Sequence, residues 1–159
     1  MKNVAKILLR GVGQVMLQNN AATGLLFLVG VFFNSWIMGL GAVVGTIIGT
    51  LAAKWFRYSD EDINGGIYGF NGALVGIATW FYYGLSVPSA LALLVGAVLS
   101  TFIMHAMKAK MSAFTAPFVL ATWLVMLSVK LVGGMPLVSS ALPSSEALDL
   151  LSTVGMGIG

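Results

Sequence analysis

The chain has 159 residues, of which 58% are hydrophobic and only 8% are charged, and its mean hydropathy is +0.97. Soluble domains carry about 25% charged residues, so this composition indicates an integral membrane protein and excludes an ordinary soluble one. The net charge of +3 is small and spread along the chain, which argues against nucleic-acid binding, and the absence of cysteine excludes disulfides and thiolate metal sites.

The first elements are predicted from a long run without charge. No charged side chain occurs between Gly11 and Ala53, and a crossing helix needs about 20 apolar residues, so this run exceeds one crossing. Turn signals cut it at Asn19-Asn20, at Asn34-Ser35 and at the charged stretch 54–62. The cuts predict membrane-crossing helices at about 3–18, 20–33 and 37–56.

Three glycines recur on one face of the third expected helix. Gly41, Gly45 and Gly49 stand four residues apart, which places them on one side of a helix and lets another backbone approach closely. The repeat therefore predicts helix packing and carries no chemistry of its own.

The next segment, about 66–82, contains the stretch IYGFNGALVGIATW and is short and rich in glycine. An acidic cluster, Asp60 to Asp62, precedes it and is expected to be a solvated loop, while a turn is expected after it, at 84–88. Irregular backbone is allowed at membrane depth only where it lines a cavity inside the protein. Two interpretations are open: a re-entrant half-helix, which we favour for the fold class, or a sixth, ordinary crossing with glycines for packing.

Two further crossings complete the expected fold. The segment from Ile63 to Met107 has no ionisable side chain besides tyrosines and His105, and turn signals occur at 108–110 and 133–134. They predict helices at about 88–107 and 113–132, with a tail at 133–159. Pro117 fixes a helix start and lacks an amide donor. A helix that opens inside the membrane would leave carbonyl and amide groups free to line a pore.

Catalytic and metal-binding patterns are missing from the sequence. His105 has no second histidine and no acidic residue within a helical turn, so neither a metal site nor a catalytic triad forms around it. The polar residues within the apolar segments are uncharged, and ion-coupled pumps usually carry charged groups there. We therefore expect no enzyme and no cofactor, but passive movement of a neutral solute. These polar residues are Gln14, Gln18, Asn19, Asn20, Asn71, Thr115, Thr122 and Ser128.

Three blocks of the sequence resemble the urea transporter family. They are LLRGVGQVMLQNNAATGLL at 8–26, INGGIYGFNGALVGIA at 63–78 and FTAPFVLATWLVML at 114–127. Members of that family are passive urea channels built from two inverted halves, each with five crossings and one re-entrant pore helix. The resemblance implies that residues 1–132 form a single such repeat, equivalent to one half of the channel, with the tail after it.

The resemblance also implies a pore. Carbonyls near Gly72, Ala73 and Leu74, with the Thr115 hydroxyl, would form a row of acceptors for the N–H groups of urea, and Gln14 would lie near the entrance. Phe70, Asn71 and Phe118, which belong to the same two blocks, are assigned to the pore with them. Leu17 stands where the family often has phenylalanine, which leaves urea, acetamide, ammonia or water as the solute. No metal is implied.

The half length implies an assembly. A single repeat could rebuild the pore by pairing with an inverted copy of itself, as an antiparallel homodimer within a trimer of pairs, embedded in lipid as a multi-pass protein of a bacterial inner membrane. The expected sides of the membrane carry five and three cations, a weak bias: Lys2, Lys6, Arg10, Lys108 and Lys110 against Lys54, Arg57 and Lys130. Met1 and the tail favour an intact protein over a fragment, and a non-conducting accessory subunit is the rival function.

Overall fold

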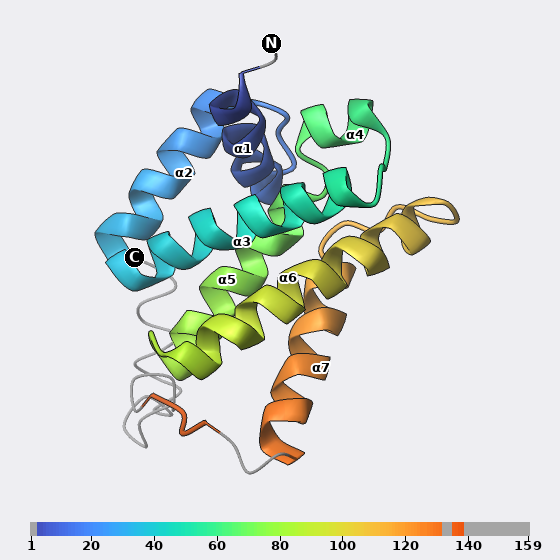
Figure 1. Cartoon of the computed structure of the whole chain (residues 1–159). Coiled ribbons are helices and arrows are strands. Elements are labelled where there is room, and N and C mark those ends of the chain that lie inside the picture. The colour runs from blue at the N-terminus through green and yellow to red at the C-terminus, as the bar shows by residue number, and fades with distance from the viewer. Residues whose placement is uncertain (1–2, 132–134, 139–159) are drawn as a thin grey trace, which may run out of the picture.

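A computed structural model of the chain describes residues 3–131 and 135–138, and every regular element in this part is helical (Figure 1). This confirms the expected helical class. The expected tail lies outside the described residues except for 135–138. In chain order the elements are α1 Val4–Gly13, the 3-10 helix η1 Gln14–Met16, α2 Ala21–Asn34, α3 Trp36–Trp55, α4 Asp60–Gly65, α5 Gly69–Tyr83, α6 Val87–Lys108 and α7 Ala116–Leu131.

Two helices of the described part are long and apolar enough by themselves to cross a membrane: α3 with 20 residues and α6 with 22. The helices α1 and α2 meet that test only together, and they are bent by 74° at the break between them. With 10 and 14 residues they extend for about 15 and 21 Å, less than the roughly 30 Å of hydrocarbon. In place of the two crossings expected at 3–18 and 20–33, the structure has one broken span or re-entrant pair.

The bend between α1 and α2 is held by close backbone contact. Leu17 ends η1 in the left-handed region, with a φ of 57°, so the chain turns before α2 begins. A Cβ on Gly24 would lie 1.8 Å from the Leu9 carbonyl oxygen, so only glycine permits this crossing of α2 over α1.

The glycine repeat of α3 packs against α5, as the sequence predicts. A Cβ on Gly45 would lie 2.0 Å from the Gly72 oxygen, and one on Gly41 would lie 2.5 Å from the Gly76 oxygen. Because Gly45 lies C-terminal to Gly41 while Gly72 lies N-terminal to Gly76, the two helices run antiparallel. The contact between α3 and α5 is the most extensive between helices in the described part.

The path of α5 depends on the ends that it connects. The rings of Phe56 and Phe102 are 4.4 Å apart, and the ring of Tyr58 stacks on His105 at 3.7 Å. The C-terminal ends of α3 and α6 therefore lie together, and α5 runs back between these two parallel helices (Figure 1). This is the direction of a crossing helix, the second of the two interpretations of segment 66–82, although its 15 residues extend for only about 22 Å.

The prediction of a loop at 60–62 is wrong, because these residues form the first turn of the helix α4. Asp60, Glu61 and Asp62 occupy its first turn, where negative charge is stabilised by the free N–H groups of the helix start. Gly66 ends α4 in the left-handed region with a φ of 81°, which glycine adopts without steric cost.

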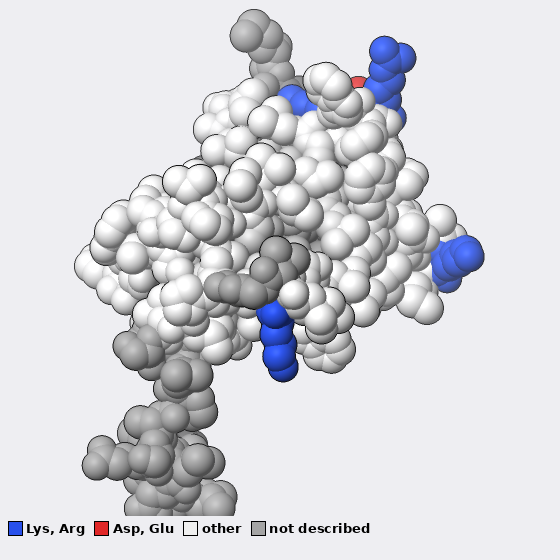
Figure 2. Space-filling view, turned by 60° about the horizontal axis from the view of Figure 1, so that its bottom comes forward, with Lys and Arg blue, Asp and Glu red and all other residues white. Residues whose placement is uncertain are grey.

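The outer surface suits a lipid environment. Figure 2 shows a broad face made of residues other than Lys, Arg, Asp and Glu, with a few cationic side chains projecting from its edges. Large apolar side chains are strongly exposed on several helices, among them Phe33 at 88% and Leu26 at 73%. Exposed apolar surface on this scale would be unfavourable in water and is expected where hydrocarbon contacts the protein.

Candidate functional site

The candidate site is a hollow of about 660 Å³ at the end of the molecule where η1, the start of α5, the end of α6 and the loop between α6 and α7 meet. Gln14 and Leu17 line it from the η1 turn, Phe70 from α5, and Lys110 and Phe114 from the loop. Three of the residues that the sequence assigns to a pore, Gln14, Leu17 and Phe70, are therefore brought together from segments more than 50 positions apart.

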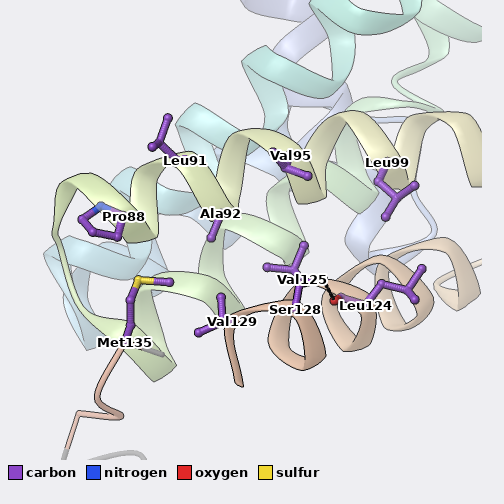
Figure 3. Close-up of a pocket in the computed structure, with 10 residues that line it drawn as sticks. All are labelled: Pro88, Leu91, Ala92, Val95, Leu99, Leu124, Val125, Ser128, Val129 and Met135. Carbon is purple, nitrogen blue, oxygen red and sulfur yellow. Dashed lines mark hydrogen bonds between the residues drawn. The ribbon is translucent and has the colours of Figure 1, made fainter. Parts of the chain in front are cut away.

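A second hollow, of about 550 Å³, lies between α6 and α7 and is apolar along its length (Figure 3). Leu91 and Val95 of α6 line it together with Val125 and Val129 of α7. Its one hydroxyl, on Ser128, already donates to the Leu124 carbonyl oxygen at 2.7 Å. This groove offers no set of free acceptors to a polar solute, so it is not the candidate site.

Gln14 is fixed by the end of α4. Its Nε2 donates to the Gly65 carbonyl oxygen at 3.0 Å, and Arg10, one turn earlier, donates from a terminal guanidinium nitrogen to the Asn64 oxygen at 3.4 Å. The two side chains thus bind consecutive carbonyls that the helix end leaves without intrahelical partners. Gln14 also lines the hollow, so its side chain is held at the wall by the bond from Nε2 to Gly65.

Leu17 presents an apolar side chain to the same hollow. It is 64% exposed and has a φ of 57°, a conformation that side chains with a Cβ rarely adopt. The turn is closed by the Leu17 amide, which donates to the Gln14 carbonyl oxygen at 2.8 Å. The residue that stands at the family's aromatic position is thereby placed on the wall, beside Gln14.

Asn71 does not open to the hollow. It is 0% exposed, and its Nδ2 donates to the Phe114 carbonyl oxygen at 3.3 Å and contacts the Met104 sulfur at 3.6 Å. Its Oδ1 accepts a hydrogen bond from the Phe118 amide at 3.0 Å. The carboxamide of α5 therefore binds the start of α7.

The start of α7 carries two more of the expected pore residues. Thr115 is exposed, and its carbonyl oxygen accepts the first hydrogen bond of α7, from the Val119 amide at 3.1 Å. Phe118 lies one turn later and is half-buried. As Pro117 predicts, the helix begins at its neighbour Ala116. Thr115, Phe118 and Asn71 thus gather where α5 meets α7.

The remaining three expected residues lie within α5. The Gly72 oxygen faces Gly45 of α3, Ala73 is fully buried, and Leu74 packs against the core cluster around Tyr68. None of the three lines the hollow. Carbonyls in the interior of an α-helix accept hydrogen bonds from the amides four residues later, so these oxygens are not free acceptors in this conformation.

An aromatic and ionic cluster beside the hollow was not expected from the sequence. The Tyr68 hydroxyl lies 3.2 Å from His105 Nδ1, whose ring stacks on Tyr58, and Lys108 forms an ion pair with Asp62. Burial raises the pKa of the Tyr58 hydroxyl above its ordinary value. No local sequence motif predicts these contacts, because the two residues of each pair lie on different elements.

The comparisons with known proteins agree with the sequence blocks. The family model "Urea transporter" matches residues 5–159. The chain is 28% identical over 171 residues to urea transporter 1 of Ovis aries, which covers 95% of the chain and 44% of the relative. It is 33% identical over 125 residues to urea transporter 1 of Rattus norvegicus, covering 74% of the chain and 32% of the relative. The chain thus spans less than half the length of the curated relatives it matches.

Proposed function

Because the chain belongs to the urea transporter family, we propose that it forms one half of a passive pathway for urea across a cell membrane. The observation that carries this proposal is that Gln14, Leu17 and Phe70 line one hollow together with Phe114, the neighbour of Thr115, in an otherwise apolar helical protein. A passive pathway needs no coupling ion, and no enzymatic step is proposed.

The chemistry of urea fits these residues. Urea is flat and neutral and has four N–H donors, so acceptor oxygens replace part of its water shell while apolar side chains contact its faces. In this proposal Gln14 Oε1 and the Thr115 hydroxyl are the acceptors, and Leu17, Phe70 and Phe118 form the walls. A hydrated ion would find too few partners to replace its water, so it should be excluded.

The residues Gly72, Ala73 and Leu74 have a structural role in this proposal, as part of the helix α5. Their oxygens stay bonded within α5, so we assign them to the packing that fixes Phe70 and Asn71. The row of carbonyl acceptors that the resemblance implies would require α5 to unwind locally around these three positions.

The pathway requires a second half. If the pair α1–α2 forms one broken span and α3, α5, α6 and α7 each cross the membrane, the repeat has an odd number of crossings, which places its two ends on opposite sides. A complementary half of opposite orientation would then bring a second set of acceptors into line with the first. One candidate source of this half, expected from the resemblance, is an inverted copy of the chain in an antiparallel homodimer.

The distribution of cations helps to decide whether the complementary half is an inverted copy of the chain or a different polypeptide segment. Lys108 pairs with Asp62 of α4, Arg10 binds a carbonyl of the same helix, and Lys54 and Arg57 directly precede it. Lys110 stands next to Lys108 in the adjoining loop, whereas Lys130 lies at the far end of α7. The expected division of five against three is therefore wrong, since Lys54 and Arg57 share the end of Lys108. Such asymmetry favours one orientation, and with it a completing half that is a different polypeptide segment.

Swelling of proteoliposomes that contain only this chain tests the function. If inverted copies complete the pore, a urea gradient gives rapid swelling and a sucrose gradient gives none. If a different segment is required, swelling appears only when the complementary half is reconstituted with it. Absence of urea flux in both preparations would contradict the proposal and favour a non-conducting accessory subunit. Parallel gradients of acetamide, ammonia and water identify the preferred solute.

A further inference from the structure

The start of α7 leaves one backbone amide and one backbone carbonyl without a helical hydrogen bond. In a continuous α-helix the Phe118 amide would donate to the Phe114 carbonyl oxygen, four residues earlier. Phe114 instead has a φ of 41°, in the left-handed region, and the first hydrogen bond of α7 runs from Val119 to Thr115. The amide and carbonyl that would have added one more bond are thus both left without their helical partner.

Asn71 supplies partners to both groups. Its Nδ2 donates to the Phe114 oxygen at 3.3 Å, and its Oδ1 accepts from the Phe118 amide at 3.0 Å. One carboxamide therefore takes the place of one backbone hydrogen bond, with the correct polarity at each end. An amide is the group suited to this task, because it carries a donor and an acceptor side by side.

The burial of Asn71 keeps its carboxamide away from solvent and from any solute. The side chain is 0% exposed, and a buried amide that lacks hydrogen bonds is strongly unfavourable. Its third contact, from Nδ2 to the Met104 sulfur at 3.6 Å, ties the same group to α6. No part of the carboxamide is free to bind a passing solute.

We infer that Asn71 is a positioning residue that fixes the first turn of α7 and thereby sets the place of Thr115, next to Phe114, which lines the candidate site. Without the Asn71 carboxamide, a hydrogen bond from the Phe118 amide to the Phe114 carbonyl oxygen would become favourable. This bond would extend α7 toward its N-terminus and place Thr115 in a helical turn. The inference concerns the structure of this junction, and its effect on urea flux rests on the proposed function.

Three variants separate this role from general packing. Asn71→Leu has a similar size but neither donor nor acceptor. Asn71→Asp keeps the shape, and its protonated carboxyl group regains one donor and one acceptor. Thr79→Val is the matched control, because Thr79 is also buried on α5 but its hydroxyl donates only within the helix, to Val75 at 2.7 Å.

The first readout does not depend on transport. The chain has no cysteine, so Thr115→Cys provides a single thiol whose labelling rate reports the environment of position 115. We expect Asn71→Leu to change that rate at least fivefold and Thr79→Val to leave it within twofold. An unchanged rate in Asn71→Leu would overturn the inference even if urea flux proves normal or absent in every preparation.

The second readout is the pH profile of Asn71→Asp. Labelling and urea flux should approach the wild-type values as the pH falls through the titration of the new carboxyl group, because the acid form can bind both Phe114 and Phe118. The profiles of the wild type and of Asn71→Leu serve as references, because both keep the other titratable groups around the site, His105, Tyr68, Asp62 and Lys108. A profile of Asn71→Asp that parallels that of Asn71→Leu would contradict the positioning role. Absent flux in the wild type would instead count against the proposed function.

Discussion

Single residues at the site divide into those that hold backbone and those that remain free. Gln14 and Arg10 bind the last carbonyls of α4, and Asn71 binds both sides of the break before α7. Thr115 differs from them, because it is exposed and its backbone already serves the helix. In the proposed function this exposed hydroxyl exchanges a water molecule for a urea N–H group.

Thr115→Val tests that assignment. Loss of one hydrogen bond that stabilises the solute in transit costs about 0.5–1.5 kcal/mol, which corresponds to roughly a two- to tenfold lower urea permeability. The measurement is light scattering of proteoliposomes after a urea gradient. Ser128→Ala removes a hydroxyl from the same helix on the side of the apolar groove and should leave permeability unchanged. Equal permeability of Thr115→Val and wild type would remove Thr115 from the pathway.

Among the helices, the seam between α3 and α5 determines where the site lies. Glycines on both helices allow backbone to touch backbone, so α5 is held against α3 along its length. Phe70 and Asn71 stand on the first turns of α5, and their positions depend on that seam. The glycine contacts between α3 and α5 therefore determine where Phe70 and Asn71 lie.

Gly45→Ala is expected to weaken the fold, because the added methyl group would lie 2.0 Å from the Gly72 oxygen. Forcing the helices apart should cost about 1–3 kcal/mol and displace Phe70 and Asn71. The thermal unfolding midpoint in detergent measures the effect. Gly30→Ala on α2 is the control, since nothing lies within 4 Å of its added Cβ, and there the better helix former should stabilise by about 0.5–1 kcal/mol. Similar midpoints for the two variants would contradict the seam.

In the molecule as a whole, the cations mark one end. The ends of α3 and α6 and the loop after α6 place Lys54, Arg57, Lys108 and Lys110 together, while Lys130 lies at the opposite end. The same end holds the candidate hollow. From the positive-inside rule we predict that this end faces the cytoplasm, so that in the proposed function the hollow would form the inner mouth of the pathway.

Two single-cysteine variants check this orientation in intact cells. Ser112→Cys lies in the loop after Lys110, and Leu85→Cys lies in the turn between α5 and α6, where Leu85 is 52% exposed. We expect an impermeant thiol reagent to label Leu85→Cys from outside and Ser112→Cys only after permeabilisation. Labelling of both positions from both faces would show dual topology and restore the inverted copy as the completing half.

Much of the fold could be predicted from the sequence because it depends on local properties. The scarcity of charge indicated the membrane class, Pro117 indicated a helix start, which the structure has at Ala116 against the expected 113, and the four-residue spacing of Gly41, Gly45 and Gly49 indicated a close helix contact. The family blocks identified the urea transporter family, which the family model bears out. Each of these signals lies within a few neighbouring residues, where sequence and conformation are directly coupled.

The relations between distant segments emerged only from the folded chain. The direction of α5 depends on which ends of α3 and α6 pack together, and the sides of the charges depend on that direction. The role of Asn71 depends on a left-handed Phe114 more than 40 positions away. Such contacts are determined by the packing of the whole chain, because a buried carboxamide binds the groups that the fold places beside it. The spacing of residues in the sequence does not identify those partners.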